Sequence, residues 1–260
     1  MKISPNAYYN YKKDRKASYR AQKKEIQDNM LEIYHEYSGN PGYRMMQIYL
    51  SRINISLSTT TVLKYMQELK IKSTITPKKP GYKKGECYKR FDNLLGRNFN
   101  ASQPNEKWCT DFTYLFMEDG RKRYNCSIID LYDKSAVATM NSNHIDASLA
   151  IKTLEIALRK NNYPENILLH SDQGWHYQHA HYQCALREHG ITQSMSRKGN
   201  CLDNSVMENF FGLLKNEFYY VNQFSDEQNF LKALAEYIRY YNNDRIKLRL
   251  NTSPIQYRQN

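Results

Sequence analysis

The order of strand-like and helical runs after residue 105 restricts the fold of this chain more than any other feature of its sequence. Three strand-like runs come first, separated by polar turns: WCTDFTYLF, RYNCSIIDLYD and SAVATM. A helix, a buried strand, a helix and a strand follow in DASLAIKTLEIALRK, ILLHSD, AHYQCALREHG and ITQSMS, and two helices near 203–219 and 225–242 close the series. Three successive strands predict an antiparallel meander, and the later alternation predicts a mixed sheet with helices on both faces. We therefore expect an α/β fold over residues 105–260.

Residues 1–72 predict a small all-α domain. Apolar residues at 26, 30, 33 and 37 recur at helical spacing, and the glycines and proline at 39–42 end that helix. Residues 43–52 predict a second helix, and Ser58 can cap a third, which places Val62, Met66 and Leu69 on one face and Lys64 among the polar residues on the other. Short helices in this order form helix-turn-helix modules that bind DNA, and they also form ordinary packing modules.

Positive charge is concentrated at the start of the chain, which favours DNA binding. Residues 1–100 contain 20 Lys+Arg against 8 Asp+Glu, whereas residues 101–260 contain 18 of each. Such an asymmetry is typical of an arm that lies along a polyanion, and residues 73–104, rich in Lys, Pro, Gly and Tyr, predict an extended basic linker. A solvated basic face is the alternative, and a membrane surface is a weaker one because the chain has no long apolar run.

The cysteines and the first residues indicate the compartment. Five cysteines are widely spaced and never form a CxxC pair, which is typical of a reducing cytosol rather than of a disulfide framework. The first 16 residues lack the apolar core of a secretory signal. We expect a cytoplasmic protein.

Two aspartates are placed where a carboxylate needs a partner. Asp111 lies within a strand among apolar and aromatic neighbours, and desolvating it there is costly unless a cation or donor compensates. Asp172 ends the buried strand ILLHSD, and sheets of this class bind ligands beyond the carboxyl ends of their strands. Spacing alone would be weak evidence in a chain with 26 acidic residues.

Glu208 lies on a helix that starts near Asp203. At 100° per residue it shares a face with Asn204, Gly212 and Lys215, while the large apolar side chains point away. Gly212 leaves room for a close approach, and Lys215 adds a positive charge two turns further on. Three carboxylates from distant points of the chain are sufficient to hold Mg²⁺ or Mn²⁺, and two such ions can drive an in-line displacement at phosphorus.

These residues lie in motifs that resemble a known family. WCTDFTY, LLHSDQG and SMSRKGNCLDNSVMENFFGLLKNEFY resemble the transposases of bacterial insertion sequences that share a catalytic core with retroviral integrases. The ending YNNDRIKLRLNTSPIQY and the segment from GNPGYR to LKYMQELKI are similar to the same family, so the resemblance covers nearly the whole chain. After HSDQG, however, WHYQH stands where Ser and Thr are more usual in the family.

The resemblance implies a fold, an activity and partners. It implies a ribonuclease H-like fold with Asp111, Asp172 and Glu208 as the acidic triad, and Lys215 in contact with the end of the element. Such enzymes expose a 3′-hydroxyl at an element end and then join it to another phosphodiester, usually by way of a circular intermediate. Joining two ends implies a homo-oligomer on element and target DNA, and the family often fuses this chain to an upstream-frame product with a further DNA-binding domain.

Other interpretations remain open at this stage. A zinc site is the alternative for a crowded set of side chains: His170, His176, His179, His181, Cys184 and His189. Their spacings match no established zinc pattern, and His176 or His179 can instead touch DNA or order a water. Arg197 and Lys198 predict a loop that grips phosphate, or a solvated basic turn, and Asn204 can cap a helix or contact DNA. Trp175 is a packing residue or a base-stacking platform.

Two other functions must be weighed against transposition. A nuclease of the same fold would cleave DNA without joining it, but the predicted DNA-reading domain and long linker argue against that function. A DNA-binding regulator with an inactive core would lack one of the acids, and all three are present.

Overall fold

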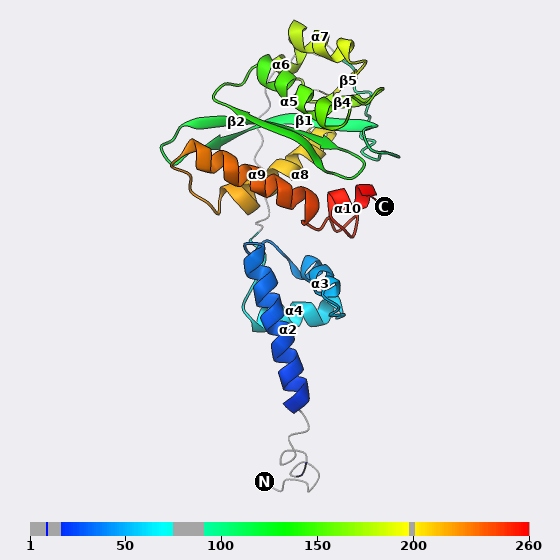
Figure 1. Cartoon of the computed structure of the whole chain (residues 1–260). Helices are drawn as coiled ribbons and strands as arrows, with labels where there is room; N and C mark the ends of the chain where they lie inside the picture. The colour runs from blue at the N-terminus through cyan, green and yellow to red at the C-terminus, as the bar shows by residue number, and fades with distance from the viewer. Residues whose placement is uncertain (1–8, 10–16, 75–90, 198–200, 260) are drawn as a thin grey trace. The chain divides into compact units, whose positions relative to one another are not determined.

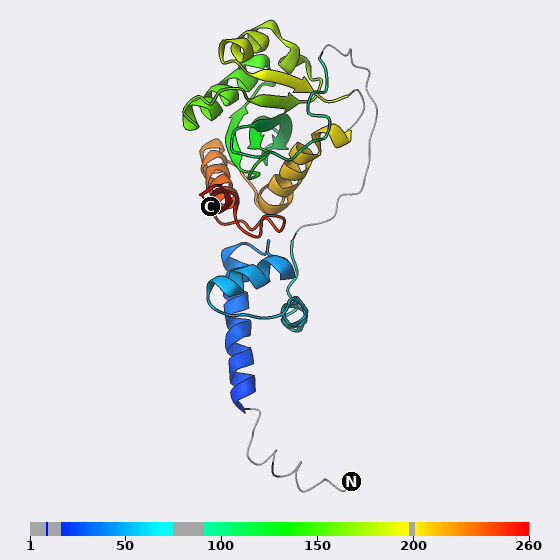
Figure 2. The ribbon, with the colours of Figure 1, turned by 90° about the vertical axis from the view of Figure 1, so that its right-hand side faces the viewer.

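The computed structural model describes Tyr9 and residues 17–74, 91–197 and 201–259. The chain divides into two compact units, residues 1–75 and 76–260, each with a core of its own (Figure 1 and Figure 2). Within the described residues, no helix is long and apolar enough to cross a membrane.

Three helices build the first unit: α2 (Ala17–Glu36), α3 (Tyr43–Arg52) and α4 (Thr59–Glu68). Their buried residues recur at the predicted helical spacing, for example Ile26, Met30 and Ile33 in α2. The backbone N–H of Thr61 donates to Ser58 Oγ at 3.3 Å, which confirms the predicted cap of the third helix. Gly39 ends α2 at φ +75°, where a Cβ would lie 3.0 Å from Tyr34 Oη, so this turn requires glycine.

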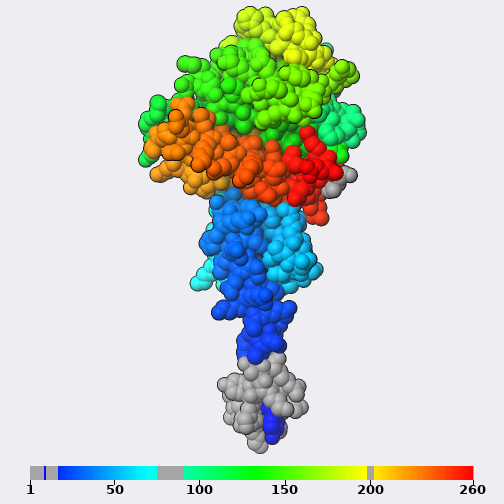
Figure 3. Space-filling view, viewed as in Figure 1, coloured from blue at the N-terminus to red at the C-terminus, as the bar shows by residue number. Residues whose placement is uncertain are grey.

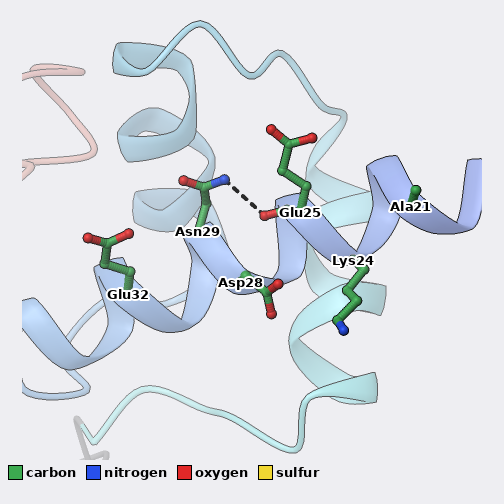
Figure 4. A pocket seen from close by; sticks show the side chains of 6 residues that line it. All are labelled: Ala21, Lys24, Glu25, Asp28, Asn29 and Glu32. Atoms are coloured by element: carbon green, nitrogen blue, oxygen red, sulfur yellow. Dashed lines mark hydrogen bonds between the residues drawn. The ribbon is translucent and has the colours of Figure 1, made fainter. Parts of the chain in front are cut away.

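One face of α2 is acidic. Figure 4 shows an open hollow lined by Ala21, Lys24, Glu25, Asp28, Asn29 and Glu32. Residues 17–74 contain only 8 Lys+Arg against 5 Asp+Glu. Most of the positive excess of the first hundred residues therefore lies at positions 1–16 and 75–90, of which the structure describes only Tyr9.

The second unit is a five-stranded mixed sheet in the order β3-β2-β1-β4-β5. Its strands are β1 (Lys107–Phe116), β2 (Lys122–Asp130), β3 (Ala136–Ser142), β4 (Leu168–Ser171) and β5 (Thr192–Met195). β1, β2 and β3 form the predicted antiparallel meander, and β4 and β5 add to β1 in parallel. This five-stranded mixed sheet with helices around it is the α/β architecture that the sequence predicts.

Helices cover both faces of the sheet (Figure 1). One layer holds α5 (Ala147–Lys160), α6 (Trp175–Gln178) and α7 (Ala180–Glu188), which pack on Trp108 and Ile128. The opposite layer holds α8 (Ser205–Leu214) and α9 (Glu227–Asn243), which pack on Cys109 and Leu115. Helix α10 (Pro254–Gln259) lies against α9, and Figure 3 shows the two side by side on the surface. Cys109 and Trp108 alternate between the layers because successive strand residues point to opposite faces.

Some local expectations need correction. At the end of the strand-like run WCTDFTYLF, the aromatic side chains of Tyr114 and Phe116 are exposed. The buried residues at that end are Leu115 and Met117, because the end of β1 is covered from the α8–α9 side. The predicted helix near 203–219 is in three parts: the 3₁₀ turn η1 (Cys201–Asn204), α8, and the π-helix η2 (Lys215–Tyr219). The short helices α6 and α10 carry no sequence signal that predicted them.

The segment that begins at residue 91 packs into the core of the second unit, to which it belongs. Leu95 is buried in its core, and its backbone N–H donates to Ser194 Oγ at 3.0 Å. Asn93 Nδ2 donates to Asp203 Oδ2 at 2.8 Å. The extended linker predicted over 73–104 therefore remains a prediction for residues 75–90, which lie outside the described residues.

Candidate active site

The pairing of β1 with β4 brings two of the predicted acids to one place. The strands run parallel, with Lys107 opposite Leu168 and Cys109 opposite His170. Continuing this register by two residues sets Asp172, the first residue after β4, beside Asp111 in β1. Side chains that face each other across parallel strands point to the same side of the sheet, so the two carboxylates share one environment.

Burial disfavours the charged forms of both aspartates, and neighbouring negative charges disfavour that of Asp111 further. Burial raises the pKa of Asp111 well above its ordinary value, and the charges of Asp172 and Glu208 raise it further. Hydrogen bonds partly compensate: Phe112 N–H donates to Asp111 Oδ1 at 2.7 Å. Burial also raises the pKa of Asp172, against a 2.8 Å bond from Gly174 N–H to its Oδ1. Two such carboxylates are stabilised when a cation lies between them.

Glu208 lies on α8, whose apolar side holds the helix against the sheet. Met207, Phe210, Phe211 and Leu214 are buried in the core, whereas Glu208 is exposed. Its charge contributes to the raised pKa of Asp111, so it lies within electrostatic reach of that carboxylate. Among the residues that the structure describes, no three His, Cys, Asp or Glu side chains are spaced as a metal-binding group. The structure thus pairs the two aspartates, with Glu208 nearby on the outer face of α8.

Unpartnered polar atoms surround this pair of aspartates. Asn204 Oδ1 and both ring nitrogens of His176 are buried, and no described group forms a hydrogen bond with them. A Cβ at Gly174 would lie 2.6 Å from His176 Nε2 and 2.8 Å from Asp172 Oδ1, so only glycine fits between those two side chains. Buried polar atoms without partners mark places where an ion or a water belongs. Carboxylate and amide oxygens are the ligands that hard divalent cations prefer, so the donor set fits Mg²⁺ or Mn²⁺.

The histidines considered as zinc ligands have different surroundings from one another. His170 is buried between Ser194 and Ser196, and burial lowers its pKa to about 4. His179 caps α7 by accepting from His181 N–H at 3.3 Å, and His189 stacks on Tyr163. His176 packs edge-on against Phe112, and burial lowers its pKa to about 4. Of the set, His176 is the one that borders an aspartate of the site.

The residues predicted to contact DNA differ in how exposed they are and in what they bond to. Lys64 is exposed on α4, and Lys215 begins η2 with its Nζ 4.9 Å from the centre of the Tyr114 ring. Asn204 is buried, and its Nδ2 donates to Asp111 Oδ2 at 3.0 Å. Arg197 donates from both its backbone and its guanidinium to Asp203. Lys198 lies outside the described residues.

Sequence reasoning missed the role of Asp203. This fully buried carboxylate accepts hydrogen bonds from Asn93, Arg97 and Arg197, and so ties two separate segments to the start of α8. The hydrogen bonds from Arg197, together with those from Arg97, hold its pKa well below the ordinary value. An acid just ahead of a helix is a common cap, so the sequence offered no signal for partners about a hundred residues away.

Comparison with known families is consistent with this architecture. The integrase core domain matches in two parts, over residues 101–201 and 208–260, and an HTH-like domain matches residues 21–79. The transposase InsK for insertion sequence element IS150 of Escherichia coli (strain K12) is 42% identical over 235 residues, which are 90% of this chain and 83% of that protein. The transposase InsF for insertion sequence IS3A of the same organism is 37% identical over 147 residues, 56% of this chain and 51% of InsF. This chain belongs to the IS3 family of insertion-sequence transposases.

Two further comparisons extend the likeness of this transposase. A transposase-like protein of Haemophilus influenzae is 42% identical over 210 residues, covering 80% of this chain and 95% of that protein. Among solved structures, a chain of the simian T-cell lymphotropic virus intasome in complex with PP2A regulatory subunit B56 gamma aligns with a TM-score of 0.55. That alignment has 16% sequence identity and covers 89% of this chain and 74% of the viral one, and it shows the fold alone.

Proposed function

We propose that this transposase cuts and rejoins DNA strands at the ends of an insertion sequence, with Asp111, Asp172 and Glu208 as the catalytic acids. Asp111 and Asp172, from adjacent parts of the sheet, would hold Mg²⁺ or Mn²⁺, and Glu208 on α8 would be the third ligand. Two such ions supply Lewis-acid activation of the attacking oxygen and stabilise the leaving oxygen. The observation that carries the proposal is the placement of Asp111 beside Asp172, where burial and mutual charge raise the pKa of Asp111.

The reaction needs two displacements at phosphorus. In the first, a water oxygen attacks a phosphodiester at the element end, the bond from phosphorus to the 3′-oxygen breaks, and a free 3′-hydroxyl and a 5′-phosphate result. In the second, that hydroxyl attacks another phosphodiester, a new P–O bond forms, and the displaced 3′-oxygen takes up the proton. Each step exchanges one P–O bond for another, so no covalent enzyme intermediate and no external energy source is required.

The residues around the acids have distinct tasks in this proposal. Asn204 orients the Asp111 carboxylate through its 3.0 Å hydrogen bond. Lys215, one residue past α8, contacts a phosphate of the element end, and Arg197 lies on the loop that leads to the same helix. Because Arg197 is bound to the buried Asp203, it acts on DNA through the position of that loop as well as through its own charge.

The first unit recognises DNA in the same proposal. Its HTH-like helices present Lys64 on the exposed side of α4, and the basic positions 1–16 and 75–90 add sequence-independent attraction to phosphate. Joining two ends on target DNA requires at least two copies of the chain. An upstream-frame product with a further DNA-binding domain would add to recognition of the element end.

The test is the substitution Glu208→Gln, which keeps the shape of the side chain and removes its charge. We expect the variant to lose cleavage and joining of a labelled element end in Mg²⁺ or Mn²⁺, to bind Mn²⁺ more weakly in calorimetry, and to retain binding of the end. Glu155→Gln, an exposed glutamate on α5 in the opposite helix layer, is the matched control and should behave as the wild type. Full cleavage by Glu208→Gln would overturn the assignment of the acids, and cleavage without joining by the wild type would identify a nuclease.

A further inference from the structure

Exposed aromatic rings and lysines lie together where β1 meets η2. Tyr114 is 54% exposed and Phe116 42% exposed, with ring centres 5.6 Å apart. Lys215 Nζ lies 4.9 Å from the centre of the Tyr114 ring, and Lys122 Nζ lies 5.6 Å from the centre of the Phe116 ring. Both lysines are therefore held against aromatic faces by cation–π attraction.

Two tyrosines of η2 and its end continue this surface. Tyr219 Oη donates to Phe116 O and accepts from Phe116 N–H, each at 2.9 Å, which fixes η2 to the end of β1. The ring of Tyr220, 67% exposed, lies 5.2 Å from that of Tyr219. The six residues Tyr114, Phe116, Lys122, Lys215, Tyr219 and Tyr220 are called the aromatic–lysine strip.

The core does not require these exposed rings. Within the described part of the second unit, five large aromatic side chains are exposed, and three of them, Tyr114, Phe116 and Tyr220, belong to the strip. The residues that close the core at this end are Leu115 and Met117, on the other side of the strand. Grouped exposed apolar side chains mark an interaction surface.

We propose that the aromatic–lysine strip binds an unpaired DNA strand next to the active site. Unpaired bases expose faces that stack on aromatic rings, and lysines between the rings meet the phosphates. The strip lies on both elements that carry acids. Tyr114 follows Asp111 by three residues in β1, on the opposite face of that strand, and Lys215 follows Glu208 by seven residues, two turns further along at the end of α8. This proposal rests on the proposed function, since it names the form of DNA that the same site takes.

The charges around the strip favour DNA over the other occupants. A second copy of the strip placed against the first would bring four lysines together, which opposes self-association. Two acidic residues, Glu118 and Asp119, lie in the turn after β1, and Asp119 is paired with Arg121. A paired duplex would meet the lysines but would leave the rings without bases to stack on.

The experiment compares a blunt duplex with the same duplex carrying a single-stranded extension of about six nucleotides, 5′ or 3′. Affinities of the full chain are measured by fluorescence anisotropy in EDTA, so that neither cleavage nor metal binding by the acids contributes. We expect the wild type to bind one of the extended probes at least about tenfold more tightly than the blunt one. The double variant Tyr114→Ala/Phe116→Ala should bind the extended and the blunt probes with equal affinity. The variant Tyr114→Phe should retain the preference for the extended probe.

A matched control comes from elsewhere on the same unit. Tyr163 is 57% exposed, close to the value for Tyr114, and lies in the connection between α5 and β4. Tyr163→Ala should retain the full preference for the extension. The proposal would be overturned if the wild type bound all probes with equal affinity, or if the double variant kept the full preference for the extension. It would also be overturned if the double variant lost self-association and kept the preference. Because the assay contains no divalent metal, its outcome is independent of whether Glu208→Gln still cleaves.

Discussion

Asn204 Nδ2 donates a hydrogen bond of 3.0 Å to Asp111 Oδ2, joining the residue ahead of α8 to the strand at the centre of the sheet. Asn204 is buried, and no described group bonds to its Oδ1. The amide therefore fixes the orientation of one carboxylate oxygen, while its own oxygen stays buried without a described partner. The contact of Asn204 with DNA stays a prediction, and its hydrogen bond also positions Asp111, one of the proposed catalytic acids.

Replacing this amide with a carboxylate should harm catalysis more than it harms folding. In Asn204→Asp the donor to Asp111 is lost and a third buried negative charge is added, so we expect cleavage to fall by at least about tenfold, as for loss of one positioning hydrogen bond of roughly 1.5 to 3 kcal/mol. Single-turnover cleavage at saturating Mn²⁺ measures this, and thermal unfolding checks the fold. Asn204→Gln, which retains an amide, should be less impaired; wild-type cleavage by Asn204→Asp would contradict the positioning role.

Asp203 should contribute stability that depends on pH. Hydrogen bonds from Arg197 and Arg97 hold its folded-state pKa below the unfolded value, so its contribution is present above a pH of about 4 and is lost as pH falls toward the folded-state pKa. Asp203→Asn should cost about 1.5 to 3 kcal/mol at neutral pH, as expected for losing hydrogen bonds to a buried charged group whose arginine partners remain solvated. Urea unfolding at pH 7 and at pH 3 measures the difference, which should shrink at the lower pH.

The control for Asp203 is another aspartate with an arginine partner. Asp119 is paired with Arg121 in the turn after β1, where both side chains are largely exposed to water. Solvent screens such a pair, so Asp119→Asn should leave the urea midpoint almost unchanged at both pH values. An equal effect of the two substitutions would show that burial of Asp203 is unimportant.

The sequence predicted those parts of the molecule that depend on local pattern. The strands, the buried end of β4 before Asp172 and the helix of Glu208 all follow from alternation or helical spacing, and the structure reproduces them. The burial of Asn204 depends on a partner 93 positions away, and that of Asp203 on partners more than a hundred positions away. Periodicity contains no information on such contacts. The exposure of Tyr114 likewise depends on where the helix layers end.

The buried ion pair of Glu217 and Arg245 should be among the most sensitive points of the fold. Glu217 lies in the π-helix η2 and accepts hydrogen bonds from Arg245 Nε at 2.8 Å and Nη2 at 2.6 Å, and Tyr237 Oη donates to it at 3.2 Å. Glu217→Gln leaves a buried guanidinium without its counter-charge, which costs about 3 to 5 kcal/mol. Urea unfolding measures the loss, and replacing both partners with apolar residues should recover part of it. If the free energy of unfolding of Glu217→Gln changed by less than about 1 kcal/mol, the result would show that water screens this ion pair.

The basic positions ahead of α2 should account for much of the salt dependence of DNA binding. Residues 1–16 contain five Lys+Arg, namely Lys2, Lys12, Lys13, Arg15 and Lys16. Each phosphate neutralised contributes about 0.9 to the slope of log affinity against log salt, so replacing all five with Gln should lower the slope by up to about 4.5. The Lys64→Gln variant on α4 should lower it by about 1. Affinity for an element-end duplex, measured over a series of salt concentrations, gives both slopes. An unchanged slope in the five-site variant would mean that these residues do not contact phosphate, and the positive charge that binds DNA would have to lie at 75–90 or on α4.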